Sequence, residues 1–152
     1  MHVLLWAAQV VWALVHIQHV MLELYSDSSI DISLDSDTSI LHANWKGYQS
    51  MNTGTQGCAR ILDLMVKHQA WLILNDNTDV RGLWMATAEW AARDWFPHMK
   101  ESGMRRFAWV YSPAKFSQIS ADTAMALLDP AESGVRIFHE KAAALDWLTQ
   151  PD

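Results

Sequence analysis

Three polar segments follow strand-like runs and hold the residues best suited to chemistry: residues 46–49, 75–79 and 112–113. In open α/β sheets, ligands collect beyond the carboxyl ends of the parallel strands, so we expect these segments to be loops at one edge. The carboxylates and amides of 75–79 could bind a cation, hold a polar ligand or present Thr78 for phosphorylation. The same residue types also form tight turns and cap helices.

Metal and nucleophile chemistry find little support in the sequence. None of the seven histidines forms a close metal motif with a carboxylate, although His16 and His19 are three apart and could share a metal. The single cysteine, Cys58, excludes multi-cysteine zinc and iron–sulfur sites, and on the apolar stripe of a helix it is expected to be inert. No Gly-x-Ser-x-Gly elbow and no glycine-rich phosphate motif is present. We therefore expect neither metal nor cofactor.

Nine tryptophans are unusual for a chain of this size. Trp84, Trp90 and Trp95 fall on one predicted helix, and Trp109 falls on a central strand. Core packing explains most of them. A helix with tryptophan on more than one face cannot bury all of them against one sheet, however. Trp90 or Phe96 is therefore expected to cover a pocket or a subunit interface, where aromatic residues are enriched.

The composition indicates one globular domain. The chain has 152 residues, of which 51% are hydrophobic and 18% charged, and this length is sufficient to bury a core. The net charge of -6, without a basic block, argues against sequence-independent nucleic-acid binding.

Hydrophobic periodicity predicts a mixed α/β fold. Alternating residues at 22–25 and 30–34, followed by a run at 39–45, predict an antiparallel meander. Thr53 and Gln56 have the spacing of a capping box at the start of a helix. Beyond it, helices at 83–96, 117–128 and 140–148 alternate with strands at 70–74, 106–111 and 135–138. Pro97 is expected to bend or end its helix. This alternation predicts crossover connections and a largely parallel sheet.

The first twenty residues contain no Lys, Arg, Asp or Glu, and they predict an apolar N-terminal extension of helical character before a single domain at 21–152. Three interpretations stay open. The segment could lie upstream of a natural start at Met21, pack as a helix on the domain or a partner, or anchor the chain in a membrane. A basic n-region and a well-placed cleavage site for secretion are both missing, so a cytoplasmic location is expected.

Three stretches of the sequence carry a family resemblance. They are Asn44-Trp45-Lys46-Gly47-Tyr48, Leu74-Asn75-Asp76-Asn77, and a longer region that runs from Glu89-Trp90 through Asp94-Trp95-Phe96-Pro97 and Phe107-Ala108-Trp109-Val110-Tyr111-Ser112-Pro113 to Phe116-Ser117. Together they resemble small bacterial proteins related to the STAS domains, the anti-sigma-factor-antagonist fold. The resemblance covers residues 21–148 and implies a mixed sheet with helices on it.

STAS domains generally bind partner proteins or small ligands and are not enzymes. Their regulatory members are switched by phosphorylation of a Ser or Thr just after a central strand, which the resemblance matches to residues 75–79. Thr78 is the hydroxyl that could accept phosphate there, although Asp76 and Asp79 would repel the added dianion. A similar architecture recurs in lipid-binding CRAL-TRIO domains, where an apolar cavity is the working part; this link is fold analogy.

We therefore expect a non-enzymatic STAS-like regulatory or binding domain that recognises a protein partner or small ligand at the carboxyl edge of the strands. The predicted binding residues are Tyr48, Asn75, Asp76, Asn77, Trp84, Trp90 and Ser112. The alternative is a carrier of a small apolar ligand or lipid in a pocket beneath the Trp84–Trp95 helix. A third hypothesis is a hydrolytic enzyme with Asp76 or Glu89 as general base. The excess of aromatic residues also suggests a homodimer.

Overall fold

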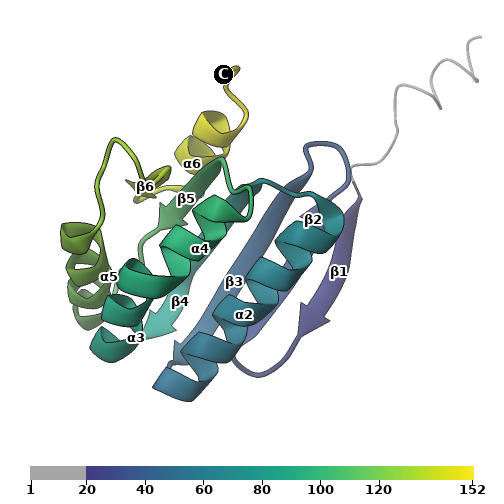
Figure 1. Cartoon of the computed structure of the whole chain (residues 1–152). Helices are drawn as coiled ribbons and strands as arrows, with labels where there is room; N and C mark the ends of the chain where they lie inside the picture. The colour runs from purple at the N-terminus through teal and green to yellow at the C-terminus, as the bar shows by residue number, and fades with distance from the viewer. Residues whose placement is uncertain (1–19) are drawn as a thin grey trace, which may run out of the picture.

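A computed structural model describes residues 20–152, which form an α/β fold around one mixed sheet (Figure 1). The predicted extension at residues 1–20 lies outside the described residues, apart from Val20. The strands follow one another across the sheet in chain order: β1 (Met21–Ser26), β2 (Ile30–Asp35), β3 (Ile40–Tyr48), β4 (Leu72–Arg81), β5 (Arg106–Val110) and β6 (Val135–Phe138). The helical elements are α2 (Met51–His68), α3 (Met85–Trp90), the π-helix η1 (Ala91–Trp95), α4 (Phe96–Glu101), α5 (Lys115–Leu127) and α6 (Lys141–Leu148).

The predicted antiparallel meander is confirmed in β1–β3. Aspartates close its turns, since a carboxylate can accept the backbone N–H groups that a turn leaves unpaired. Asp27 Oδ1 accepts from the N–H groups of Ser29 at 2.7 Å and Ile30 at 2.8 Å. In the next turn, Asp35 Oδ1 accepts from the N–H of Asp37 at 2.9 Å.

The predicted parallel half is also confirmed, because β3 pairs with β4, β4 with β5 and β5 with β6 in parallel. Helices α2, α3–η1–α4 and α5 connect these strands and contribute to a single buried core on one face (Figure 1). Ile61 and Met65 of α2 are fully buried there. The closing helix α6 buries Ala144 and Leu148 in a second, smaller core on the other face. The sheet is therefore covered by helices on both faces, as a largely parallel sheet requires.

Two of the three segments that the sequence predicted as loops lie in strands. Lys46, Gly47 and Tyr48 belong to β3, and residues 75–79 lie inside β4. The two strands pair as far as Tyr48 opposite Arg81, so backbone pairing outweighs the turn preference of the polar side chains.

A β-bulge interrupts this pairing. Asn44 faces Asp76 and Lys46 faces Asp79, so β4 has one residue more than β3 between these pairs. Side chains alternate between the two faces of a strand, so the extra residue moves each later side chain of β4 to the opposite face of the sheet. Asn75, Asn77 and then Val80 are buried as a result, although Asn77 and Val80 are three residues apart.

Both predicted helix starts near the site need correction. Helix α2 begins at Met51, because Ser50 and Thr53 form the capping box in place of Thr53 and Gln56. The second helical segment starts at Met85 and continues past Pro97 to Glu101. Proline has no N–H and crowds the carbonyl four residues earlier, so a regular turn is disfavoured. The chain adopts a π-turn instead, in which the Phe96 N–H bonds to the Ala91 carbonyl five residues back.

Within residues 20–152, no helix is long and apolar enough to cross a membrane. The same part of the chain contains no group of three or more His, Cys, Asp or Glu side chains that could hold a metal ion. The pair His16 and His19 lies outside the described residues.

Candidate functional site

A cavity of about 50 Å³ lies between the sheet and the helical segments α2, α3 and η1. Its walls are mainly aromatic: Trp45, Trp84, Trp95, Phe96, Phe107 and Trp109. The remaining lining residues are Gln49, Gly54, Cys58, Asn75, Asn77, Val80, Thr87 and Ala91. None of these described residues carries a charged side chain, so the cavity is built for uncharged groups.

The aromatic wall is closely packed. The Trp84 ring lies 5.7 Å from the Trp109 ring, centroid to centroid, at an interplanar angle of 34°. Trp109 also contacts Phe96 at 5.8 Å and Phe107 at 6.0 Å, the latter edge to face. Tilted and edge-to-face pairs at these separations are favoured by the ring quadrupoles. The rings therefore hold one another in place around the cavity.

Polar side chains in the cavity wall form a short hydrogen-bonded chain. The Trp45 indole N–H donates to Asn75 Oδ1 at 2.8 Å, and the Asn75 amide donates to Asn77 Oδ1 at 3.1 Å. Both asparagines are 4% exposed. Because a buried amide without partners is costly, these bonds explain how two asparagines are tolerated in a central strand.

Two of the other indole N–H groups in the wall also have acceptors. Trp95 donates to the Cys58 carbonyl at 2.9 Å, and Trp84 donates to Ser117 Oγ at 3.1 Å. Trp109 differs from them. Its side chain is 3% exposed, and its buried indole N–H has no hydrogen-bond partner among the residues that the structure describes.

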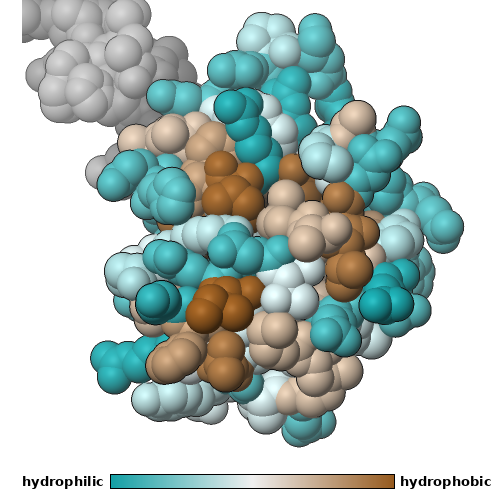
Figure 2. Space-filling view, turned by 90° about the vertical axis from the view of Figure 1, so that its left-hand side faces the viewer, coloured by the Kyte–Doolittle hydropathy of each residue, from teal (hydrophilic) through white to brown (hydrophobic). Residues whose placement is uncertain are grey.

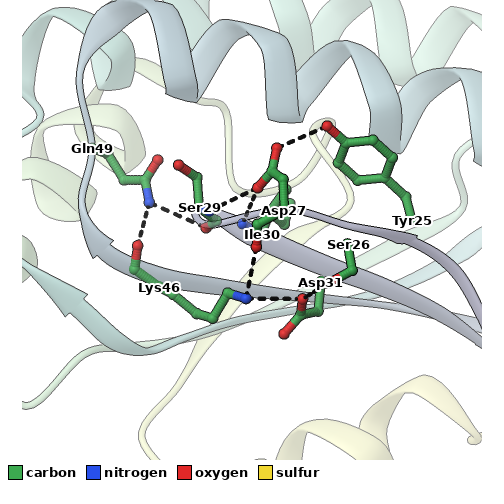
Figure 3. A network of polar contacts seen from close by, with 8 residues as sticks. All are labelled: Tyr25, Ser26, Asp27, Ser29, Ile30, Asp31, Lys46 and Gln49. Carbon is green, nitrogen blue, oxygen red and sulfur yellow. Dashed lines mark hydrogen bonds and ion pairs between the residues drawn. The ribbon is translucent and has the colours of Figure 1, made fainter.

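Gln49 is fixed by a polar network that extends into the β1–β2 turn (Figure 3). Its amide donates to the carbonyls of Lys46 at 2.8 Å and Ser29 at 3.3 Å, while its oxygen accepts from Thr53 Oγ1 at 2.9 Å. Lys46 is held in turn by Asp31 Oδ1 at 2.9 Å (Figure 3). The Gln49 side chain, which lines the cavity, is therefore positioned by residues of β3, of the β1–β2 turn and of α2.

The opening of the cavity lies between Gln49 and Trp84, since these two lining residues are half-buried and the others are buried. Helices α2 and α3 approach closely beside it. A Cβ atom added at Gly54 would lie within 3.0 Å of the Thr87 side chain, so glycine permits this approach. The Thr87 hydroxyl contacts Met51 Sδ at 3.6 Å.

Two backbone irregularities flank the cavity. The bulge in β4 follows Asn75, and the π-turn η1 contains Ala91 and Trp95. Both kinds of irregularity are over-represented at functional sites, because they re-aim side chains that a regular element would place elsewhere.

The structure brings together three of the residues that the sequence predicted as binding residues. Asn75, Asn77 and Trp84 line the cavity. Tyr48 lies at the end of β3, 76% exposed, with its ring against Gly82. Trp90 is half-buried and packs on the core outside the cavity lining.

The other predicted residues lie apart from the cavity. Asp76 accepts from the backbone N–H of Thr78 at 2.9 Å and from its hydroxyl, and both line a separate shallow groove. Ser112 is buried and bridges the Val80 carbonyl and the Ala114 N–H, at 2.7 Å and 3.0 Å. Both bonds link parts of the chain backbone, so Ser112 has a structural role.

Phe96, which the sequence suggested as a residue covering a pocket, lines the cavity, whereas Trp90 does not. Four other aromatic lining residues were not predicted: Trp45, Trp95, Phe107 and Trp109. Periodicity assigns them correctly to the core side of their elements. The signal in the sequence that could have found them was the large number of aromatic side chains together with two asparagines in one buried strand.

Cys58 is buried in the cavity wall, and burial raises the pKa of its thiol well above the ordinary range. Burial and a raised pKa both favour the protonated thiol, so we expect Cys58 to react slowly.

The chain matches no protein-family model, and a comparison with curated proteins finds no relative with significant similarity. The cavity itself is therefore the basis for any functional conclusion.

Proposed function

We propose that this chain is a non-enzymatic, STAS-like binding domain that holds the apolar end of a small molecule in the aromatic cavity. The supporting observation is an uncharged cavity, lined by six aromatic rings and open beside Trp84. The cavity lies against the face of the sheet beneath α2, α3 and η1, which favours the alternative considered from the sequence, an apolar pocket beneath the Trp84–Trp95 helix, over a site at the carboxyl edge of the strands. The mixed sheet and the sequence resemblance favour the STAS-like assignment.

The cavity volume limits what can enter. About 50 Å³ is several times the roughly 10–15 Å³ that one water needs, and about a third of the roughly 150 Å³ cavity that holds benzene. A group of a few heavy atoms therefore fits inside, and the rest of the ligand lies at the opening beside Trp84.

The same volume predicts modest affinity from the cavity alone. Each buried heavy atom contributes at most about 1.5 kcal/mol, so about four atoms give a dissociation constant no tighter than tens of micromolar. Tighter binding requires contacts outside the cavity, for which Trp84 and Gln49 are placed.

The position of the chemical groups favours binding over catalysis. Asp76 and Glu89, the general bases considered from the sequence, lie outside the cavity lining. General base catalysis needs a carboxylate within hydrogen-bond reach of the substrate.

Native mass spectrometry of the full chain, purified from its own host, tests this function. Ala91→Leu fills the cavity, and Ala142→Leu adds the same atoms at an exposed position of α6. We expect wild type and Ala142→Leu to retain a small molecule that denaturation releases, and Ala91→Leu to lose it. A bare wild-type mass, with no change in the tryptophan spectra on adding α-methylstyrene, would contradict the proposal.

A second candidate is protein contact through exposed apolar side chains next to the opening. Phe116 and Ile119 of α5 are 60% and 40% exposed, and Leu83 is 54% exposed. The Trp84 N–H donates to Ser120 Oγ at 2.9 Å, which places Leu83 beside α5. Figure 2, which views the molecule from the α5 side, shows hydrophobic patches among hydrophilic side chains.

We propose a second copy of the chain as the occupant of this surface, because Phe116 is a large aromatic side chain that is 60% exposed beside the apolar Leu83 and Ile119, as the side chains of a homodimer interface would be. Light scattering should return a dimer for wild type and a monomer for Phe116→Ser. A wild-type monomer at high concentration would exclude this candidate.

A further inference from the structure

We propose that the indole N–H of Trp109 recognises the ligand, and that the cavity therefore selects a neutral apolar group bearing one hydrogen-bond acceptor. This inference rests on the proposed binding function and names the chemistry of its ligand. Carbonyl-bearing small molecules, such as ketones and esters, fit this description.

The first step is the inventory of donors in the wall. The indole N–H groups of Trp45, Trp84 and Trp95 have acceptors at 2.8, 3.1 and 2.9 Å. The amides of Asn75 and Gln49 also donate within the protein. Trp109 is left as a donor without a partner in the described part of the chain, although it lies in the cavity wall.

The second step is the cost of leaving that donor unpaired. A buried N–H without an acceptor destabilises a protein by about 1–3 kcal/mol, so native structures seldom keep one. An ordered water would need two to four polar partners, whereas the Trp109 ring is in contact with the rings of Trp84, Phe96 and Phe107. A ligand acceptor would satisfy the N–H and occupy the apolar space with the same molecule.

The third step is charge. Among residues 20–152, no charged side chain lines the cavity, so an ionised ligand group would be buried there without a counter-charge. An anion could accept the Trp109 hydrogen bond, but the loss of its hydration would outweigh one neutral donor. The acceptor must therefore belong to an uncharged group.

Two probes of nearly identical shape separate hydrogen bonding from apolar contact. Acetophenone carries a carbonyl where α-methylstyrene carries a CH₂ group, and the three heavy atoms of its acetyl end suit the cavity. Each is titrated into the ¹⁵N-labelled full chain while the indole N–H signals are followed by NMR. The signal missing from Trp109→Phe identifies Trp109.

We expect acetophenone to move the Trp109 proton signal downfield, as hydrogen bonding does, and α-methylstyrene to leave it without a downfield shift. Benzoate should cause no such shift at the same concentration. The affinity ratio of acetophenone to α-methylstyrene should fall about fivefold in Trp109→Phe, the factor expected for one neutral hydrogen bond. Any enlargement of the cavity by phenylalanine affects both probes and cancels in the ratio.

An unchanged ratio together with equal shifts from both probes would overturn this inference and leave the proposed binding function standing. A downfield shift at another indole would also overturn it. If Trp109→Phe does not fold, the wild-type contrast between the two probes decides the question. If neither probe binds and the native mass is bare, the binding function itself fails.

Discussion

A close approach between Gly57 of α2 and Trp45 of the sheet yields a sharp test of the packing that forms the cavity. Gly57 is buried in the middle of α2, where alanine would normally be preferred by about 1 kcal/mol. A Cβ atom at this position would, however, lie within 3.0 Å of Cη2 and Cζ3 of Trp45. Trp45 is 7% exposed and donates to Asn75, so its ring has little freedom to move.

Overpacking therefore outweighs helix propensity in Gly57→Ala. Forcing an extra carbon into a packed core costs about 1–3 kcal/mol, and breaking the Trp45–Asn75 bond leaves a buried amide oxygen at a further cost of about 1–3 kcal/mol. After subtracting the gain of about 1 kcal/mol in helix propensity, we expect a net destabilisation of about 1–5 kcal/mol. Phenylalanine lacks the outer ring atoms of Trp45, so in a Trp45→Phe background the substitution should become neutral or stabilising.

Urea unfolding followed by far-UV circular dichroism measures all four members of this double-mutant cycle. Gln56→Ala, at the exposed neighbouring position, is the control and should change the free energy of unfolding by less than about 0.5 kcal/mol. If Gly57→Ala stabilises the protein, or costs the same in both backgrounds, then Trp45 does not pack against α2 as described.

Two other predictions concern ionisable groups. Burial raises the pKa of the Cys58 thiol, so a thiol reagent at pH 8 should label it orders of magnitude more slowly in the native protein than in denaturant; equal rates would show that the wall is open. The Ser26 hydroxyl and the Lys46 ammonium lower the pKa of Asp31 in the folded protein. Ionised Asp31 therefore stabilises the fold above its unfolded pKa of about 3.9, and this contribution is lost as the pH falls below that value. Because the Lys46–Asp31 pair is partly exposed, Asp31→Asn should lower the free energy of unfolding by less than about 1 kcal/mol at pH 7 and by nothing near pH 2. Urea titrations at both pH values measure this difference. A difference that does not change with pH would exclude the ion pair as the cause of the destabilisation.

The fold could be predicted from the sequence where a regular period controls the structure. The alternation at 22–25 and 30–34 located β1 and β2, and residues 135–138 were predicted as β6 with the observed bounds. The polar run 75–79 misled the prediction, because Asp, Asn and Thr are typical of turns. Its strand character depends on pairing with β3 and on the Trp45 indole, which are distant in the sequence.

The site was predicted only in part for a related reason. The polar run singled out Asn75 and Asn77, although it was assigned to a loop and lies inside β4, and the tryptophan pattern singled out Trp84. Periodicity places Trp45, Phe107 and Trp109 in the core but cannot show that their rings enclose a space. That space depends on the bulge in β4 and on the π-turn before Pro97, which shift side chains away from their regular positions.

The cavity and the Trp109 donor, which has no partner among the described residues, both reduce the stability of the domain. At about 24 cal/mol per Å³, a space of about 50 Å³ costs at most about 1 kcal/mol, because its opening admits solvent, and the buried donor costs a further amount of about 1–3 kcal/mol. Against a total stability of about 5–15 kcal/mol, these costs are considerable. Single substitutions would remove both costs, since Ala91→Leu would fill the cavity and Trp109→Phe would remove the indole donor. Departures from close packing and from complete hydrogen bonding are mostly found where function requires them. Both departures occur at this cavity, which lies beside the bulge in β4 and the π-turn η1. A ligand that fills the space and accepts the hydrogen bond would reverse both costs on binding, so the same features that weaken the free protein would favour its complex.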